Sequence, residues 1–114
     1  MIPPSIESVG TDVSVAPQLD ADAMAWVAGA GFRSVINNRP DFEAGPDQPT
    51  SATIEASATA CGLRYAYLPV SPSVHTPDDI RRFAQLLVEL PKPVLAFCRS
   101  GTRSRKLYRA ASGD

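Results

Sequence analysis

A cysteine and two arginines share a short polar stretch near the end of the chain. Cys98 directly follows the apolar run 94–97, and the next five residues, Arg99 to Arg103, are small or cationic and include one glycine. The apolar run begins after a proline and is typical of a buried strand. The residues from Ser104 onward are expected to form a helix. The pattern therefore predicts a strand, a tight loop and a helix around Cys98.

This arrangement has chemical consequences. The backbone N–H groups of a tight loop and of a helix N-terminus point at one place, and the helix adds about half a positive charge there. Such surroundings favour the thiolate form of a cysteine, which is its nucleophilic form, and they also bind oxyanions. We therefore predict that Cys98 is a nucleophile that acts on an anionic substrate. The alternative is that Cys98 is only a small buried apolar residue at a strand end.

Strands and helices alternate along the rest of the chain. The predicted strands are 6–9, 12–16, 32–37, 63–70 and 94–97, and the predicted helices are 21–30, 51–60, 77–90 and a last one from 104. Hydroxyl or carboxylate residues that can cap a helix precede the first three helices, at Asp20, Thr50 and Thr76. This order predicts a three-layer α/β fold, in which helices flank a mostly parallel sheet of four or five strands. We expect residues 1–114 to form one domain.

In such a sheet, sites form beyond the carboxyl ends of the strands. Three loops meet that condition: the loop after Ile36, the loop after Val70 and the Cys98 loop. The loop 38–49 is long and rich in Pro, Asp and Gly, and long loops without structure of their own are often functional. Asn38 and Arg39 begin this loop, so we expect them to line the site.

Composition excludes several classes of function. The chain has 114 residues and a net charge of −1, so no basic surface favours nucleic-acid binding. The start lacks the pattern of a signal peptide and no apolar run is long enough to span a membrane, so we expect a cytoplasmic protein. Cys61 and Cys98 make no CxxC pair, and no structural disulfide is expected. One histidine and two distant cysteines predict no metal site and no cofactor.

Three segments carry a family resemblance. They are Ile36-Asn37-Asn38-Arg39-Pro40-Asp41, Tyr67-Leu68-Pro69-Val70 and Phe97-Cys98-Arg99-Ser100-Gly101-Thr102-Arg103-Ser104. Together they resemble the bacterial beta-lactamase-hydrolase-like family, over nearly the whole chain. The small domain of that family is described both as phosphatase-like and as a sulfur transferase. The resemblance implies the fold of dual-specificity phosphatases, with Cys98 as the nucleophile, and it leaves the reaction open.

The loop spacing bears on that choice. Cysteine phosphatases use a Cys-x5-Arg loop with a glycine three residues after the cysteine. Gly101 occupies that glycine position, but the sixth position after Cys98 is Ser104, and arginine stands at the fifth, Arg103. A Cys-x4-Arg loop resembles that of single-domain rhodaneses, which carry sulfur as a cysteine persulfide. The spacing therefore favours sulfur transfer.

The general acid is a second departure from the phosphatase pattern. In dual-specificity phosphatases an aspartate follows the strand that the segment Tyr67 to Val70 resembles, and here that position is Pro72. A positioned acid contributes about 10²–10⁴-fold to cleavage of an ester. Asp41 is the candidate substitute in this chain, with Glu43 and His75 as further possibilities. Sulfur transfer with sulfite as the leaving group needs no such acid.

We therefore predict a sulfurtransferase with a ping-pong mechanism. The Cys98 thiolate takes sulfane sulfur from thiosulfate or a persulfide and passes it to a thiol acceptor; a persulfide-handling enzyme is a possible partner. Arg103 is predicted to neutralise the donor. The anion is expected to contact Arg99, Ser100, Gly101, Thr102, Ser104, Asn38 and Arg39. The alternatives are a cysteine-dependent phosphatase acting on phosphotyrosine or small phosphoesters, and a non-enzymatic module that binds anions or senses thiol oxidation.

Overall fold

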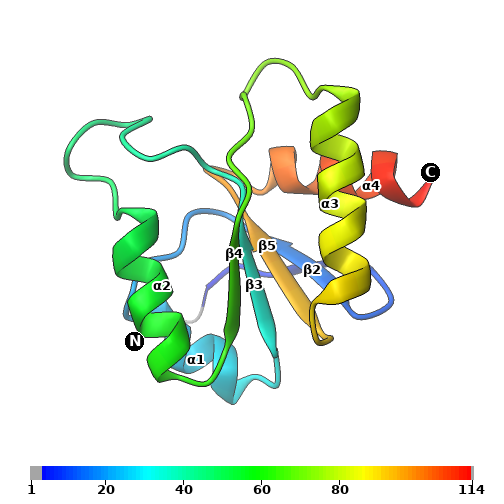
Figure 1. Cartoon of the computed structure of the whole chain (residues 1–114). Helices are drawn as coiled ribbons and strands as arrows, with labels where there is room; N and C mark the ends of the chain where they lie inside the picture. The colour runs from blue at the N-terminus through cyan, green and yellow to red at the C-terminus, as the bar shows by residue number, and fades with distance from the viewer. Residues whose placement is uncertain (1–3, 114) are drawn as a thin grey trace.

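A five-stranded sheet forms the centre of the computed structural model, which describes residues 4–113 (Figure 1). In chain order the elements are β1 (Glu7–Gly10), β2 (Val13–Ala16), α1 (Ala23–Gly29), β3 (Ser34–Asn37), α2 (Ser51–Ala60), β4 (Arg64–Tyr67), α3 (Pro77–Glu89), β5 (Val94–Phe97) and α4 (Thr102–Ser112). The strand order is β1-β2-β5-β3-β4. Only the β1–β2 pair is antiparallel, so the predicted fold class, a mostly parallel sheet flanked by helices, is confirmed.

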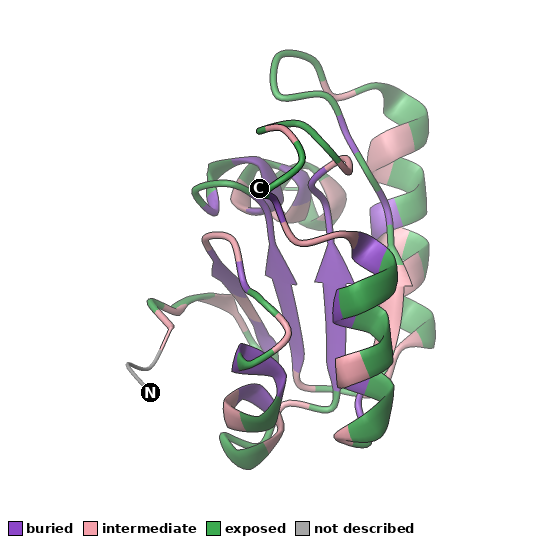
Figure 2. Cartoon of the chain, turned by 90° about the vertical axis from the view of Figure 1, so that its left-hand side faces the viewer, coloured by how far each residue is buried: buried purple, intermediate pink, exposed green. Residues whose placement is uncertain are grey.

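The helices cover the sheet in pairs, α1 and α2 on one face and α3 and α4 on the other (Figure 1). Side chains alternate between the faces along a strand. In β3, Val35 packs with the α1 and α2 residues and Ile36 with the α3 and α4 residues. The strands β3 and β5 are buried along their whole length at the centre of the sheet (Figure 2).

The carboxyl ends of four strands are level. Phe97 of β5 pairs with Ala16 of β2 and with Asn37 of β3, and Asn37 also pairs with Tyr67 of β4. The loops that follow these strands therefore emerge at one edge of the sheet. This confirms that the loop after β3, the segment after β4 and the Cys98 loop meet there.

The predicted boundaries agree with the structure to within two residues, except at the end of β4. Helix α3 begins with the predicted cap, where Thr76 and Asp79 form reciprocal side-chain to backbone bonds. Strand β4 ends at Tyr67 rather than at residue 70, because the N–H groups of Leu68 and Val70 donate to the successive carbonyls of Asn37 and Asn38, so the regular ladder stops there. Helix α4 begins at Thr102 rather than Ser104, because Gly101 turns the chain directly into it.

Within residues 4–113, no helix is long and apolar enough to cross a membrane.

Candidate active site

Cys98 lies at the end of the central strand β5, under the loop that leads into α4. It is 1% exposed, and its Sγ accepts a hydrogen bond from the backbone N–H of Gly101 at 3.1 Å. Its own N–H donates to the carbonyl of Ala16 at the end of β2. The cysteine is therefore held at the predicted strand end with one loop amide directed at its sulfur.

Gly101 allows the loop to close so tightly. Its φ is +90°, in the left-handed region that side chains disfavour, and a Cβ there would lie 3.4 Å from the carbonyl carbon of Ala16. Because Gly101 is the N-cap of α4, Thr102 and Arg103 belong to the first turn of that helix. The first-turn N–H groups of a helix have no partners within it and favour negative charge nearby. The Cys98 loop thus leads directly into a helix N-terminus, and its binding of an anion stays a prediction.

Arg103 extends from this first turn and is 8% exposed. Its Nη1 donates to Glu43 Oε2 at 3.0 Å and to the Val70 carbonyl at 3.2 Å, and its Nη2 donates to Glu43 Oε1 at 3.0 Å. These bonds use three of the five N–H donors of a guanidinium. Within residues 4–113, neither Nε nor the second hydrogen of Nη2 has a hydrogen-bond acceptor. The edge formed by Nε and Nη2 thus remains available for an oxyanion.

Glu43 holds a second arginine as well. Its Oε1 accepts from Arg39 Nε at 2.9 Å, and Arg39 Nη1 in turn donates to Gln18 Oε1 at 3.1 Å. The hydrogen bonds from Arg103 and then Arg39 hold the pKa of the Glu43 carboxyl below its usual range, against partial burial, which acts in the opposite direction. Glu43 is therefore an anion at neutral pH and a poor proton donor. Two guanidinium groups share one carboxylate, so this cluster keeps one net positive charge.

The backbone just before Glu43 is unusual. Phe42 has a φ of +62°, which is rare for a residue with a bulky side chain, and its ring is 63% exposed. Such a conformation persists only where the surrounding contacts hold it. The next residue, Glu43, is held by two arginines. The side chain of Phe42 is therefore exposed, while the Glu43 carboxylate points inward to the arginines.

A buried polar chain joins helix α4 to the loop after β3 and the segment after β4. Ser104 Oγ donates to Asn38 Oδ1 at 2.9 Å, and Asn38 Nδ2 donates to the Leu68 carbonyl at 3.0 Å. Ser104 and Asn38 are both completely buried. The sequence predicts that both residues contact the anion; the structure instead places them in a buried link between α4, the loop after β3 and the segment after β4.

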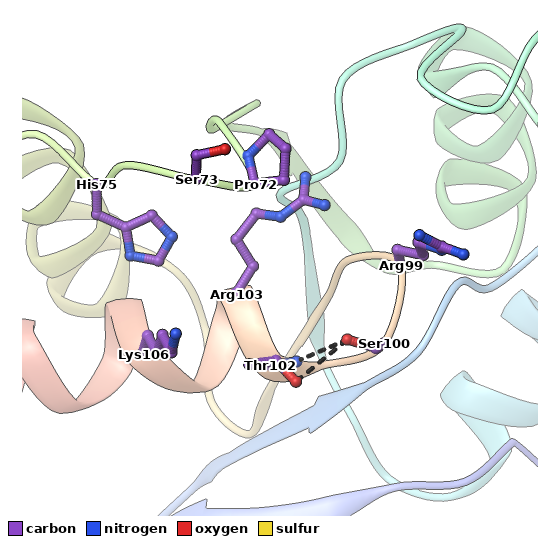
Figure 3. Close-up of a pocket in the computed structure, with 8 residues that line it drawn as sticks. All are labelled: Pro72, Ser73, His75, Arg99, Ser100, Thr102, Arg103 and Lys106. Carbon is purple, nitrogen blue, oxygen red and sulfur yellow. Dashed lines mark hydrogen bonds between the residues drawn. The ribbon is translucent and has the colours of Figure 1, made fainter.

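A cavity of about 440 Å³ opens beside the Cys98 loop (Figure 3). It is lined by Pro72, Ser73, His75, Arg99, Ser100, Thr102, Arg103 and Lys106. Arg99, Ser100, Thr102 and Arg103 are residues that the sequence predicts for the site. Cys98 is not part of the lining, so a substrate in this cavity reaches the sulfur only if the loop shifts locally. Arg39 and Gly101 are also absent from the lining.

Asp41, the candidate acid, turns away from the cavity. Its Oδ1 accepts from the N–H of Ser51 at the start of α2, and its own N–H donates to the Tyr67 hydroxyl. The carboxylate is thus placed against a helix N-terminus, where negative charge is favourable. Pro72, at the sequence position of the phosphatase aspartate, lines the cavity, and His75 lines it as well. Burial lowers the pKa of His75, the Asp79 carboxylate acts in the opposite direction, and Lys106 and Arg103 lower the pKa further.

Two contributions escaped the sequence analysis. Glu43 was considered only as a proton donor, and its pairing with Arg103 across 60 positions of the chain has no local signal. Lys106 follows Arg103 by three positions, and such positions lie on one face of a helix. The predicted helix begins at Ser104 and leaves Arg103 outside, whereas α4 begins at Thr102, so only the structure places Lys106 on the face of Arg103.

Solved structures define the class of protein. A candidate phosphatase from Neisseria meningitidis superposes with a TM-score of 0.81 at 32% identity, covering 96% of this chain and 79% of that one. Kinase associated phosphatase, solved with serine in place of its catalytic cysteine, gives a TM-score of 0.66 at 11% identity over 88% of this chain and 67% of that one, a likeness of fold alone. The chain is thus a phosphatase-like domain.

The particular family follows from the sequence. The chain belongs to the family of the phosphatase-like domain of beta-lactamase hydrolase-like proteins, whose family model matches residues 5–113. The beta-lactamase hydrolase-like protein of Agrobacterium fabrum is 45% identical over 78 residues, which are 68% of this chain and 18% of that protein. That of Xylella fastidiosa strain Temecula1 is 35% identical over 103 residues, 90% of this chain and 24% of that protein. The chain spans less than a quarter of the length of these relatives.

These comparisons confirm the predicted family and bear on the choice of reaction. The family description and the similar structures name phosphatases. None of them names a sulfurtransferase, so the comparisons support the alternative reading, a phosphatase, better than the preferred one.

Proposed function

We propose that this domain is a cysteine-dependent phosphatase. The observation that carries the proposal is the Cys98 loop, in which the Gly101 amide faces the sulfur and Arg103 stands at the cavity wall with one guanidinium edge available. The family membership supports the same reaction. A planar guanidinium edge with two parallel donors matches the oxygens of a phosphoryl group.

The reaction proceeds in two steps. The Cys98 thiolate attacks phosphorus, the bond from phosphorus to the leaving oxygen breaks, and that oxygen takes a proton from solvent or a nearby donor. Water then attacks the phosphocysteine, which releases inorganic phosphate and returns the thiolate. Loop amides and the Nε–Nη2 edge of Arg103 hold the phosphoryl oxygens through both steps.

The leaving group must be a good one. No carboxyl group lines the cavity in the described part of the chain, and Glu43 is held as an anion by its two arginines. The lowered pKa of His75 leaves its imidazole neutral near pH 7, so it is a weak proton donor there. We therefore expect the domain to act on aryl phosphates or phosphoric anhydrides, whose leaving groups need little help from an acid.

Sulfur transfer is the second candidate, and one observation favours it. The arginine stands five residues after Cys98 rather than six, and the cavity lining offers no carboxylic acid. In this reaction the Cys98 thiolate attacks the outer sulfur of thiosulfate, sulfite leaves, and a thiol acceptor removes the sulfur from the persulfide. A small transferred atom suits a short loop.

One experiment separates the candidates. Reduced protein is mixed with p-nitrophenyl phosphate or with thiosulfate, stopped in acid, and its intact mass is measured alongside steady-state turnover. The proposal expects a phosphoryl adduct and turnover that are absent in Cys98→Ser and retained in Cys61→Ser. A sulfur adduct that cyanide or glutathione removes, with no phosphoryl adduct, would give the function to sulfur transfer. Neither adduct, with a reactive thiol, would overturn both and leave an anion-binding or redox module.

A further inference from the structure

The cavity beside the Cys98 loop carries more positive charge than one phosphoryl group requires. Arg99, Arg103 and Lys106 all line it, and no carboxylate lines it in the part of the chain that the structure describes. The chain as a whole has a net charge of −1, so this positive charge is concentrated locally. A cavity lined by one sign of charge raises the local concentration of ligands of the opposite sign.

Two of these cations are not neutralised by the protein. Arg103 is paired with Glu43, and the neighbouring Arg105 is paired with Glu7. Among residues 4–113, neither Arg99 nor Lys106 forms an ion pair with a carboxylate. Their charges are therefore available to a ligand.

Lys106 lies next to the proposed phosphoryl site, one helical turn beyond Arg103. It lies three positions after Arg103 on α4, and residues at this spacing have Cβ atoms about 5–6 Å apart on one helix face. Figure 3 shows Lys106 and His75 on one side of Arg103 and Arg99 on the other. The hydroxyl residue Ser73 also lines the cavity. The side of the cavity away from Arg99 thus holds both an ammonium and an imidazole.

His75 lies close enough to both cations to be affected by them. Burial is the main cause of its lowered pKa, the Asp79 carboxylate acts in the opposite direction, and the charges of Lys106 and Arg103 lower the pKa further. The volume of about 440 Å³ lies within the range of about 300–1,000 Å³ for small-molecule sites, so the cavity has room for more than one phosphate.

We propose that the substrates of this domain are small molecules with two anionic groups, one phosphoryl group at the Cys98 loop and a second anionic group held by Lys106 and His75. The proposal rests on the phosphatase function proposed above for the first of these two positions. Among the aryl phosphates and phosphoric anhydrides expected above, it favours those that carry a second anionic group over those with a single phosphate on an apolar group.

Binding and turnover are tested separately. Calorimetry on Cys98→Ser compares orthophosphate with two probes that carry two phosphoryl groups, pyrophosphate and fructose 1,6-bisphosphate. We expect at least one of the two to bind about 10-fold more tightly than orthophosphate, or by about 1.4 kcal/mol, because its second anionic group adds a charge-assisted hydrogen bond. Lys106→Gln should remove most of that preference. Arg109→Gln, a cation on the same helix outside the cavity lining, should retain it.

The two proposals fail in different ways. Equal affinity for orthophosphate and both larger probes, or a preference that Lys106→Gln leaves intact, would overturn the second anionic position, whatever the wild type hydrolyses. A strong preference in Cys98→Ser without any phosphoryl adduct in the wild type would support the two-anion site and overturn the phosphatase. Circular dichroism of each variant confirms that it is folded before its affinity is interpreted.

Discussion

The Glu43 carboxylate binds both terminal nitrogens of Arg103, at 3.0 Å each, although 60 positions of the chain separate the two residues. The pair joins the long loop after β3 to the first turn of α4. It fixes the plane of the guanidinium of Arg103, which lines the cavity, and leaves the Nε–Nη2 edge available to a ligand. Glu43 is thus a positioning residue rather than a proton donor.

Replacing Glu43 tests that role. In Glu43→Gln we expect kcat with p-nitrophenyl phosphate to fall about 10-fold, because Arg103 loses a charge-assisted bond that aligns it with the transition state. KM should stay the same or fall, because a competing carboxylate is removed. A lower KM with unchanged kcat would show that Glu43 only competes with the substrate for Arg103.

The same pair has a pH signature. The pKa of Glu43 in the folded protein is lowered from 4.5, so its ion pairs stabilise the fold above that pH and are lost as pH falls through the lowered value. The difference in Tm between wild type and Glu43→Gln should therefore be largest near pH 7 and shrink below about pH 4.5. Thermal melts between pH 7 and pH 3.5 measure it, and a difference that does not depend on pH would contradict the assignment.

Arg103→Lys should lose at least about 10-fold in kcat/KM, or about 1.4 kcal/mol. An ammonium cannot present two parallel donors to an oxyanion while also binding Glu43 and the Val70 carbonyl. Arg105→Lys is the matched control, because Arg105 pairs with Glu7 and lies outside the lining of the cavity. Wild-type activity in Arg103→Lys would transfer the anion-binding role to another cation.

His75 is the one histidine of the chain, so its imidazole can be titrated by NMR without assignment. Its pKa should lie below 6.5; Lys106→Gln should raise it and Asp79→Asn should lower it further. Since the folded state binds the proton less well than the unfolded state, stability should fall as pH drops below about 6.5. A midpoint above 6.5 would contradict the positive environment of the cavity.

Ser104→Ala should destabilise the fold by about 1–3 kcal/mol, because Asn38 Oδ1 would be left buried without a donor. Urea denaturation measures the change. Ser8→Ala, which removes an exposed hydroxyl, is the control and should change stability by less than about 0.5 kcal/mol. Equal stability of the two variants would show that the Ser104–Asn38 link is not structural.

The local elements could be read from the sequence because their signals are local. An apolar run, a glycine three residues after Cys98 and a helical continuation were enough to predict β5, the tight loop and α4. Helix α2 was predicted over 51–60 and runs over Ser51–Ala60. Caps and periodicity depend on neighbours within one or two turns, so one sequence contains them.

The partners inside the site were decided by the tertiary structure. Asn38 and Ser104 were predicted to contact the anion. The packing of α4 against the loop after β3 instead buries these two residues against each other. Asp41 and Glu43 are both acidic residues of the loop 38–49, and no local sequence signal shows which of them pairs with an arginine. The path of that loop, with Phe42 turned outward, sends Asp41 to the start of α2 and Glu43 to Arg103. Which carboxylate meets which cation depends on contacts between distant segments, and those exist only once the sheet brings its loops to one edge.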